Sequence, residues 1–417
     1  MTDRSSLYID SDFLKLWVGE SISVFGSQFS PIAIQYFAYN TLHAQPLQFG
    51  ILAALGTASF LLFGIPVGLY ADRHRRKRTM IYADVGRALI LSSIPLFAIF
   101  GGLSIELFYM VAFTTGVLTV FFEICYQSYL PSLVERSKLI VANSRLQLSA
   151  SISQISGGSL AGFAVYFVSA PVAILGDVIG FFGSAGFLGS IRKPEPDQAP
   201  VASRSAWKDV KEGLSVVFKD TRLRSIAGCT ATSNLFSSAY GAVLIPFLLS
   251  VGIPVWEIGP LAALGVVGGI AGAIFSERIS KRLGVGWTII VFALLFGIAQ
   301  VPLYFVTAEN AVLVLPPVFF ALSAGVVVYN IVQVSFRQSL VPARLQGRMN
   351  ATMRTIVWGT LPIGGLLGGL MSEILGYREA VGVAVGLGAF AFMWVLFSPV
   401  RGIKEMPTPL DEPTPAV

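Results

Sequence analysis

Among the acidic residues within long apolar stretches of the sequence, Glu20, Glu123 and Asp177 are the candidates for proton chemistry. A carboxylate inside a bilayer is costly unless it is paired, hydrated or protonated, so each of them is a candidate to load and release a proton. Glu20 lies seven residues after the start of the first apolar stretch. In a helix that rises about 1.5 Å per residue, this places it about 10 Å from the helix start. Glu20 is therefore the first candidate for proton coupling, with an ion pair to Lys15 or to a basic loop as the alternative.

The other embedded charges have more local interpretations. Glu123 lies near the end of its apolar stretch, where an ion pair with Arg145 or another loop cation is the favoured alternative to coupling. Asp177 is the third coupling candidate, with helix packing or an outer gate as its alternative role. Asp84 and Arg87 are one helical turn apart, which predicts a local ion pair that supports the basic loop before them.

Composition places these residues in a membrane protein. Hydrophobic residues make up 54% of the 417 and charged residues 12%, and the mean hydropathy is +0.72. The basic residues lie in short loops between apolar runs, so the net charge of +6 indicates membrane topology and predicts no nucleic-acid partner. No enzyme motif, metal-ligand cluster or cofactor motif is present, and the two cysteines, Cys125 and Cys229, are expected to pack as small side chains.

The chain contains twelve apolar windows of membrane-spanning length. Their expected positions are 13–40, 48–70, 79–101, 104–126, 144–168, 171–190, 223–250, 256–277, 287–306, 310–333, 351–375 and 378–399. Lys and Arg concentrate in the loops after the even-numbered windows, and cationic loops stay in the cytoplasm. The sequence therefore predicts an all-helical membrane protein with both termini cytoplasmic and with no cleavable signal peptide.

Two internal repeats divide the spans into halves. The Asn and Gly pattern of 143–162 returns at 350–369, and the acidic-basic pattern of 72–77 returns at 277–282. Both are offset by just over 200 residues, which predicts two six-helix bundles in parallel orientation. The expected parts are a first bundle over 1–190, a cytoplasmic linker with an amphipathic helix over 191–222, a second bundle over 223–400 and a disordered cytoplasmic tail over 401–417.

The linker itself has two parts. Its first residues, 192–204, are rich in proline and polar side chains, which predicts a flexible connection. Residues 207–218 place apolar side chains on one helical face, which predicts an amphipathic helix on the inner membrane surface. Binding of a soluble partner is the alternative role of that face.

Polar residues within four of the spans predict the lining of a central cavity, since polar groups are costly in lipid. Hydrogen bonding between helices is the alternative for any one of them. The candidates are Ser27, Gln28, Gln35, Thr115, Asn234, Tyr240, Asn330 and Gln333.

The short basic loop between the second and third windows contains a motif. Its residues are Gly68, Asp72, Arg73 and Arg76, with Arg75 in a central position. Gly68 is expected to allow close helix approach, and Asp72 to cap a helix or pair with a cation. Contacts of this kind can form in one conformation and break in another, so we predict a gating loop.

This order of residues resembles the signature loop of the major facilitator superfamily of transporters. The resemblance covers essentially the whole chain, although the family's loop has a glycine at the place of Arg75. It implies a major facilitator fold of two pseudo-symmetric bundles, a cavity lined by the first, fourth, seventh and tenth spans, and a loop that gates alternating access.

Three segments, 128–134, 207–226 and 339–351, resemble the bacterial efflux branch that includes macrolide and enterobactin exporters. The glycine pattern at 157–162 lacks the proline of the antiporter motif, and the fourth span lacks the usual arginine. The resemblance implies a bacterial inner-membrane protein, monomeric in the lipid bilayer, that exports a small amphipathic compound such as a drug, siderophore or secondary metabolite by proton antiport. The alternatives are a metabolite or lysolipid importer or uniporter and, in another class, a membrane receptor or scaffold without transport.

Overall fold

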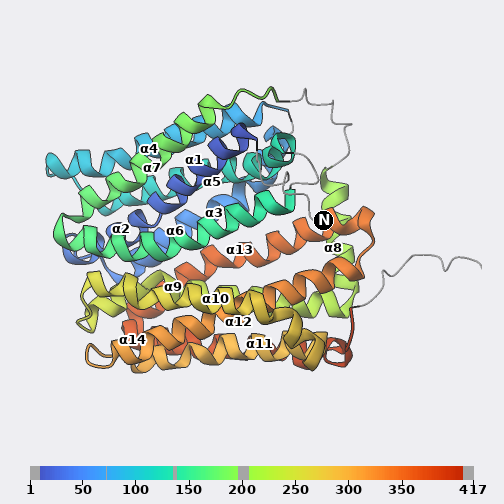
Figure 1. Cartoon of the computed structure of the whole chain (residues 1–417). Helices are drawn as coiled ribbons and strands as arrows, with labels where there is room; N and C mark the ends of the chain where they lie inside the picture. Colours follow the sequence, from blue (N-terminus) through green and yellow to red (C-terminus); the bar gives the residue numbers. More distant parts are fainter. Residues whose placement is uncertain (1–9, 72, 135–138, 196–205, 407–417) are drawn as a thin grey trace, which may run out of the picture. The chain divides into compact units, whose positions relative to one another are not determined.

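The structure is a computed structural model that describes residues 10–71, 73–134, 139–195 and 206–406. The described residues form helices and no strand, as the composition predicts (Figure 1). The helices before the linker are α1 (Ser11–Gly26), α2 (Phe29–Asn40), α3 (Pro46–Ala71), α4 (Arg76–Ile99), α5 (Ile105–Leu133), α6 (Leu139–Phe167) and α7 (Ala170–Ser190). The helices that follow are α8 (Ala206–Lys219), α9 (Thr221–Ser250), α10 (Val255–Leu283), α11 (Val285–Ala299), α12 (Ala311–Leu340), α13 (Ala343–Leu375), α14 (Tyr377–Ala389) and α15 (Met393–Leu396), with short 3-10 turns at Val301–Phe305, Phe390–Phe392 and Pro399–Gly402.

These helices account for the twelve predicted spans. Ten of the described helices are long and apolar enough to cross a membrane. The first window is divided into α1 and α2, and the fifth is α6. The division at Ser27 and Gln28 was not predicted. The Ser27 hydroxyl and the Gln28 amide both donate to the carbonyl oxygen of Val24, at 2.9 and 3.1 Å, and so compete with the helical backbone bonds.

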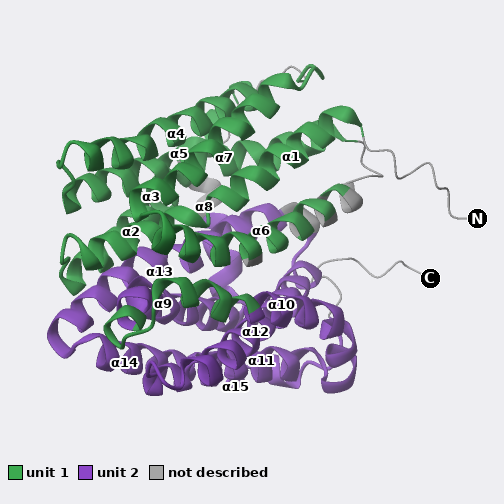
Figure 2. Ribbon diagram, turned by 60° about the vertical axis from the view of Figure 1, so that its left-hand side comes forward, with its two compact units in different colours: residues 1–202, 248–263 green, residues 203–247, 264–417 purple. Residues whose placement is uncertain are grey.

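The chain groups into two compact units (Figure 2). Unit 1 comprises residues 1–202 and 248–263, and unit 2 comprises residues 203–247 and 264–417. The two units are defined by how the helices pack, whereas the predicted bundles were defined by the sequence repeat. The main difference is that residues 248–263 group with unit 1, although the repeat placed them in the second bundle. The tail 407–417 and linker residues 196–205 lie outside the described residues.

Unit 1 is built around close helix contacts. A Cβ added at Gly26 of α1 would lie 2.7 Å from the carbonyl oxygen of Gly176 in α7, and one at Gly116 of α5 would lie 2.7 Å from that of Gly56 in α3. Such backbone contact needs glycine, because membrane helices associate through small residues. A cluster of buried apolar residues, among them Phe13, fills the end of the unit at which α1 begins.

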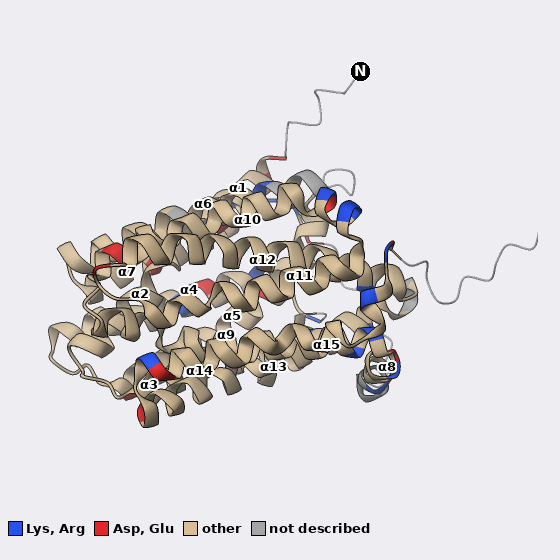
Figure 3. Cartoon of the chain, turned by 90° about the horizontal axis from the view of Figure 1, so that it is seen from below, with Lys and Arg blue, Asp and Glu red and all other residues tan. Residues whose placement is uncertain are grey.

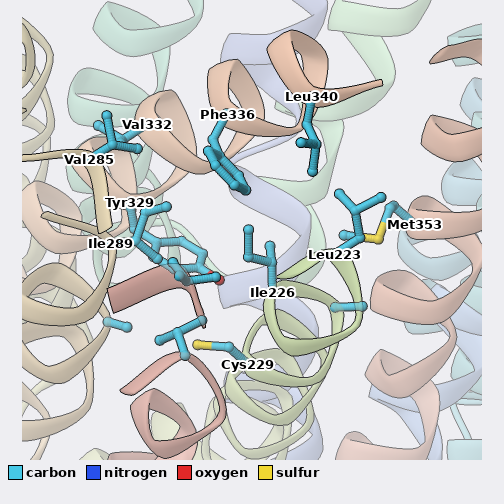
Figure 4. Close-up of a cluster of buried hydrophobic side chains, with 14 of the residues drawn as sticks. Leu223, Ile226, Cys229, Val285, Ile289, Tyr329, Val332, Phe336, Leu340 and Met353 are labelled. Carbon is cyan, nitrogen blue, oxygen red and sulfur yellow. The ribbon is translucent and has the colours of Figure 1, made fainter. Parts of the chain in front are cut away.

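Unit 2 has its own apolar core (Figure 4). Ile226 and Cys229 of α9, Ile289 of α11 and Tyr329 of α12 all belong to one cluster of buried residues. Helix α8 joins this core, since Val217 is fully buried in it.

Helix α8 forms as predicted, and one of its faces packs on α13, while its expected position on the inner membrane surface remains a prediction. Gly213 lies against the backbone of Arg348 in α13, and Glu212 forms an ion pair with the Arg348 side chain. One face of α8 is therefore covered by protein. Phe218, which is 50% exposed, remains on the open side.

Asp220, between α8 and α9, generates a prediction about pH. Its carboxylate accepts hydrogen bonds from the backbone N–H of Arg222 at 2.8 Å and of Leu223 at 3.3 Å, and pairs with the Arg222 guanidinium at 2.7 Å. Burial acts to raise the pKa of Asp220, but the hydrogen bonds and charge of Arg222 outweigh it and hold this pKa below its usual value. The cap therefore stabilises the fold fully above the unfolded-state pKa, and the contribution is lost as the pH falls through the lower folded-state pKa.

We expect Asp220→Ala to cost about 1 kcal/mol of stability at neutral pH, because the start of α9 loses its cap. The difference from the native chain should vanish in acid, where the native carboxyl is also protonated. Thermal unfolding in detergent across a pH series measures both effects, with Asp220→Asn as a control that keeps an acceptor. If the stability difference between Asp220→Ala and the native chain is the same in acid as at neutral pH, the charge of Asp220 does not stabilise the start of α9.

Candidate functional site

Glu20 lies inside unit 1 with one carboxylate oxygen unsatisfied. It is nine residues from the start of α1, which corresponds to about 14 Å. Its Oε2 atom is buried and has no hydrogen-bond partner among the described residues. The predicted alternative, an ion pair with Lys15, is not supported, because the Lys15 ammonium instead binds Asp12 at 2.6 Å. Glu20 thus has the environment expected of a group that changes its charge.

Asp84 and Arg87 of α4 form the predicted ion pair, and the pair lies in the interior of unit 1. The pair is buried in the interior, with Asp84 fully buried and Arg87 6% exposed. The Arg87 guanidinium lies over the ring of Phe181 in α7, 4.1 Å from its centre, and over the ring of Phe122 in α5 at 4.6 Å. The pair therefore joins α4, α5 and α7, and its expected support of the basic loop remains a prediction.

Asp177 of α7 is 3% exposed and binds α2. Its Oδ2 atom accepts a hydrogen bond from the Ser30 hydroxyl at 2.5 Å. Its Oδ1 atom is buried and has no partner among the described residues.

The charged groups of unit 1 act on one another. Glu123 of α5, together with Asp84 and Arg87, exerts an electrostatic effect on Glu20. Arg87 also acts on Asp177. The Arg87 guanidinium thus acts on three carboxyl groups, those of Asp84, Glu20 and Asp177. Charges buried this far from water depend on one another, because each is costly without a counter-charge, a bound proton or water. Figure 3 shows how sparse charge is along the rest of the helical ribbon.

The predicted gating loop is only partly described. Asp72 lies outside the described residues, and Arg73 is exposed. No described atom lies within 4 Å of a Cβ added at Gly68, so the described residues place no helix in close contact there, and the role of Gly68 in helix approach remains a prediction. Arg76 begins α4 and donates from its guanidinium to the carbonyl oxygen of Ser128 at 3.0 Å.

An acid that the sequence analysis missed caps α4. Glu195, which follows α7, accepts hydrogen bonds from the backbone N–H of Arg76 at 2.9 Å and of Lys77 at 3.3 Å. Residue Arg75 at the cap position offers no side-chain bond. Carboxylates stabilise helix N-termini, so Glu195 fixes the basic loop to the segment after α7. The sequence signal that could have identified Glu195 is its position between two prolines that follow the basic residues Arg192 and Lys193.

Further bonds hold the same segment. The Asp12 carboxylate accepts from the backbone N–H of Arg192 at 3.2 Å and of Lys193 at 2.8 Å. The Lys193 ammonium donates to the carbonyl oxygen of Leu133 at the end of α5. The ends of α1, α4, α5 and α7 are therefore tied together through residues 191–195.

Unit 2 contains a small cavity of about 50 Å³ that is lined by both apolar and uncharged polar side chains. Its lining residues are Thr230, Ser233, Asn234, Ala293, Phe296, Val326, Tyr329 and Asn330. Two predicted cavity residues, Asn234 and Asn330, lie on it together. Asn234 also donates to the carbonyl oxygen of Val357 at 3.2 Å, so it serves the predicted alternative, helix-to-helix bonding, as well.

The other predicted cavity residues are distributed over both units. In unit 1, Gln35 and Thr115 each keep a buried oxygen without a partner among the described residues, whereas Ser27 and Gln28 bond locally at the break between α1 and α2. In unit 2, the Gln333 amide donates to the Asn330 side-chain oxygen at 3.3 Å, and Tyr240 is partly exposed on α9. Their roles in a substrate cavity remain predictions. Within the described residues, no group of three His, Cys, Asp or Glu could hold a metal ion.

Comparison with known proteins identifies relatives over most of the chain. The family model of the Major Facilitator Superfamily matches residues 16–361. Macrolide efflux protein A of Streptococcus pyogenes is 23% identical over 380 residues, which cover 88% of this chain and 91% of that protein. The multidrug efflux pump Tap of Mycolicibacterium fortuitum is 23% identical over 350 residues, or 79% and 82% of the two chains.

A solved structure of the nucleoside transporter NupG is similar in fold. It matches with a TM-score of 0.73 and 13% identity, covering 92% of this chain and 100% of that chain. The predicted fold class is thereby confirmed, and so is the predicted resemblance to the efflux branch.

The Glu195 cap gives a prediction about the loop. Glu195→Ala should expose the first amides of α4 and cost about 1 kcal/mol locally. Hydrogen exchange measures this as lower protection of the Arg76 and Lys77 amides, with Glu195→Gln, which keeps one acceptor, expected to lie between Ala and native. Equal protection in all three chains would show that Glu195 does not hold the loop.

Proposed function

The chain belongs to the Major Facilitator Superfamily of transporters, and from this premise we propose that it exports a small amphipathic compound in exchange for protons. Candidate compounds are a drug, a siderophore or a secondary metabolite. Transport proceeds by alternating access, with the loop that contains Gly68, Asp72, Arg73 and Arg76 as the gate. The relatives named as macrolide and multidrug efflux proteins support export as the direction.

The observation that carries proton exchange is the unsatisfied carboxylate of Glu20. Its Oε2 atom has no described partner, and three of its neighbours, Glu123, Asp84 and Arg87, carry two negative charges and one positive charge when ionised. A proton bound at Glu20 relieves the surplus of negative charge, and its release restores it. A carboxyl that gains and loses a proton as its surroundings change is what an exchanger requires.

The surfaces of each unit fit an amphipathic substrate. In unit 1, a groove of about 270 Å³ lies between α1 and α6. It is lined by Trp17, Val18, Ser21, Ile22, Ser149, Ile152 and Ser153. Apolar side chains alternate there with hydroxyl groups, as in sites for drug-like molecules. In unit 2, the cavity around Asn234 and Asn330 offers hydrogen bonds without charge.

The membrane setting follows from the charge distribution. We infer a bacterial inner-membrane protein with both termini in the cytoplasm, because the loops rich in Lys and Arg follow the even-numbered spans. The functional partners are the small-molecule substrate, protons and the lipid bilayer, and the functional unit is a monomer.

The exchange is tested in inside-out membrane vesicles with an imposed proton gradient, acid inside. Erythromycin, a ferric siderophore and a lipophilic cation serve as separate probes, and a quenched dye reports the gradient. We expect at least one probe to release protons with the native chain, and Glu20→Gln to reduce this release by about tenfold or more because the carboxyl can no longer ionise. Glu309→Gln, at an exposed acid outside the spans, should behave as native.

Other outcomes discriminate among the alternatives. Labelled probe that moves without proton release would contradict antiport and favour a uniporter. Unchanged proton release in Glu20→Gln would remove Glu20 from the coupling mechanism. Absence of any probe-dependent flux across a wide panel would favour a receptor or scaffold.

A further inference from the structure

Asp177 is the buried group whose chemistry the proposed function does not use. Its two oxygen atoms differ, since Oδ2 is bound by the Ser30 hydroxyl at 2.5 Å and Oδ1 is buried without a partner among the described residues. A carboxylate that is 3% exposed leaves Oδ1 as a costly unsatisfied acceptor. A proton on Oδ1 removes the negative charge and so lowers that cost, because a neutral carboxyl is less costly to bury than a carboxylate.

The break between α1 and α2 holds Asp177 in this position. Gly26, at the end of α1, lies against the backbone of α7, where a Cβ would be 3.1 Å from the Cα of Asp177. Helix α2 then begins at Phe29, which places Ser30 in its first turn, facing Asp177. Broken membrane helices commonly bind coupling ions in this way, because the break frees polar groups.

The charges that face Asp177 come from few elements. Helix α7 packs against α1, α2, α4 and α6. Helix α4 supplies Arg87, paired with Asp84, and α2 supplies the Ser30 hydroxyl. Among the charged residues of α1, Glu20 is the nearest in sequence to Gly26, the residue that packs against Asp177. The described charged side chain of α6 is Arg145, which lies over the Trp17 ring.

Arg87 connects Asp177 with Glu20. The guanidinium packs on the ring of Phe181, one turn from Asp177 on α7, and its charge acts on both carboxyl groups. The two carboxyl groups lie at different depths. Measured from the unit end where α1 begins and α7 ends, Glu20 lies at about 14 Å, Arg87 at about 16 Å and Asp177 at about 20 Å.

We propose that Asp177, held by Ser30 at the break in the first span, is a second proton-carrying site, and that Arg87 couples it to Glu20. A proton from water at the end where α7 begins adds to Oδ1 of Asp177 and returns to water when the site discharges. A proton on Asp177 leaves the Arg87 charge available to Glu20, which favours release of the proton there. This inference rests on the proposed proton exchange.

The first experiment needs no substrate. The full chain in lipid nanodiscs is treated with N,N′-dicyclohexylcarbodiimide, an apolar reagent that modifies protonated carboxyl groups, and the modified peptides are measured by mass spectrometry over a pH series. We expect Asp177 to be modified, with the extent falling as the pH rises. Ser30→Ala should move the half-point to higher pH, because the ionised form loses its hydrogen bond, whereas Ser156→Ala in α6, whose hydroxyl bonds within its own helix, should not.

The second experiment separates coupling from transport. Asp177→Asn keeps an acceptor for Ser30, so we expect exchange of labelled for unlabelled erythromycin at equal pH to stay within about twofold of native, while accumulation driven by a pH gradient falls about tenfold. Native accumulation in Asp177→Asn would overturn the proposal, as would equal loss of exchange and accumulation, which indicates a structural role.

Two further outcomes bear on the proposal. An Asp177 that stays unreactive at every pH while Glu20 reacts would overturn it, and so would protection of Asp177 by sodium at constant pH, which indicates a sodium site. If Asp177→Asn does not fold, the labelling of the native and Ser30→Ala chains decides. A native chain that moves erythromycin without protons, yet shows pH-dependent labelling at Asp177, would contradict the proposed antiport and leave the proton site supported.

Discussion

The buried ion pair of Asp84 and Arg87 is the interaction on which the interior of unit 1 depends. A guanidinium that is 6% exposed cannot be left without a counter-charge, and Asp84 supplies it from the same helix. The same guanidinium acts on Glu20 from α1 and on Asp177 from α7. Changing the charge of any one carboxyl therefore changes the balance at the others, which is the property that coupled protonation requires.

The cavity of unit 2, in contrast to the interior of unit 1, is lined by uncharged side chains. The groups around its cavity, including Asn234, Tyr329 and Asn330, are neutral, and the hydroxyl groups of Thr230 and Tyr329 are bonded at 2.7 Å. Among the buried residues described there, Arg337 is the charged exception. In the proposed function, this contrast assigns proton exchange to unit 1 and uncharged contacts with the substrate to unit 2.

The sequence predicted what depends on local composition and failed where distant segments meet. Apolar windows located the spans, and a spacing of three residues located the Asp84 and Arg87 pair, because both signals lie within one helix. The bond between Ser30 and Asp177 joins residues 147 apart, and the Glu195 cap joins residues 119 apart, so neither follows from periodicity. Gly68 was interpreted from its neighbours in sequence, but the space beside it is set by tertiary packing.

The central claim is that one guanidinium balances several carboxyl groups in unit 1. A double-mutant cycle of Asp84→Asn, Arg87→Gln and the combined variant tests it directly, with the free energy of unfolding measured in lipid nanodiscs. The account predicts that each single change costs about 3–5 kcal/mol, that Arg87→Gln costs more than Asp84→Asn because Glu20 and Asp177 also lose their cation, and that the combined variant costs less than the sum. Costs that simply add, with both single changes equal, would contradict it.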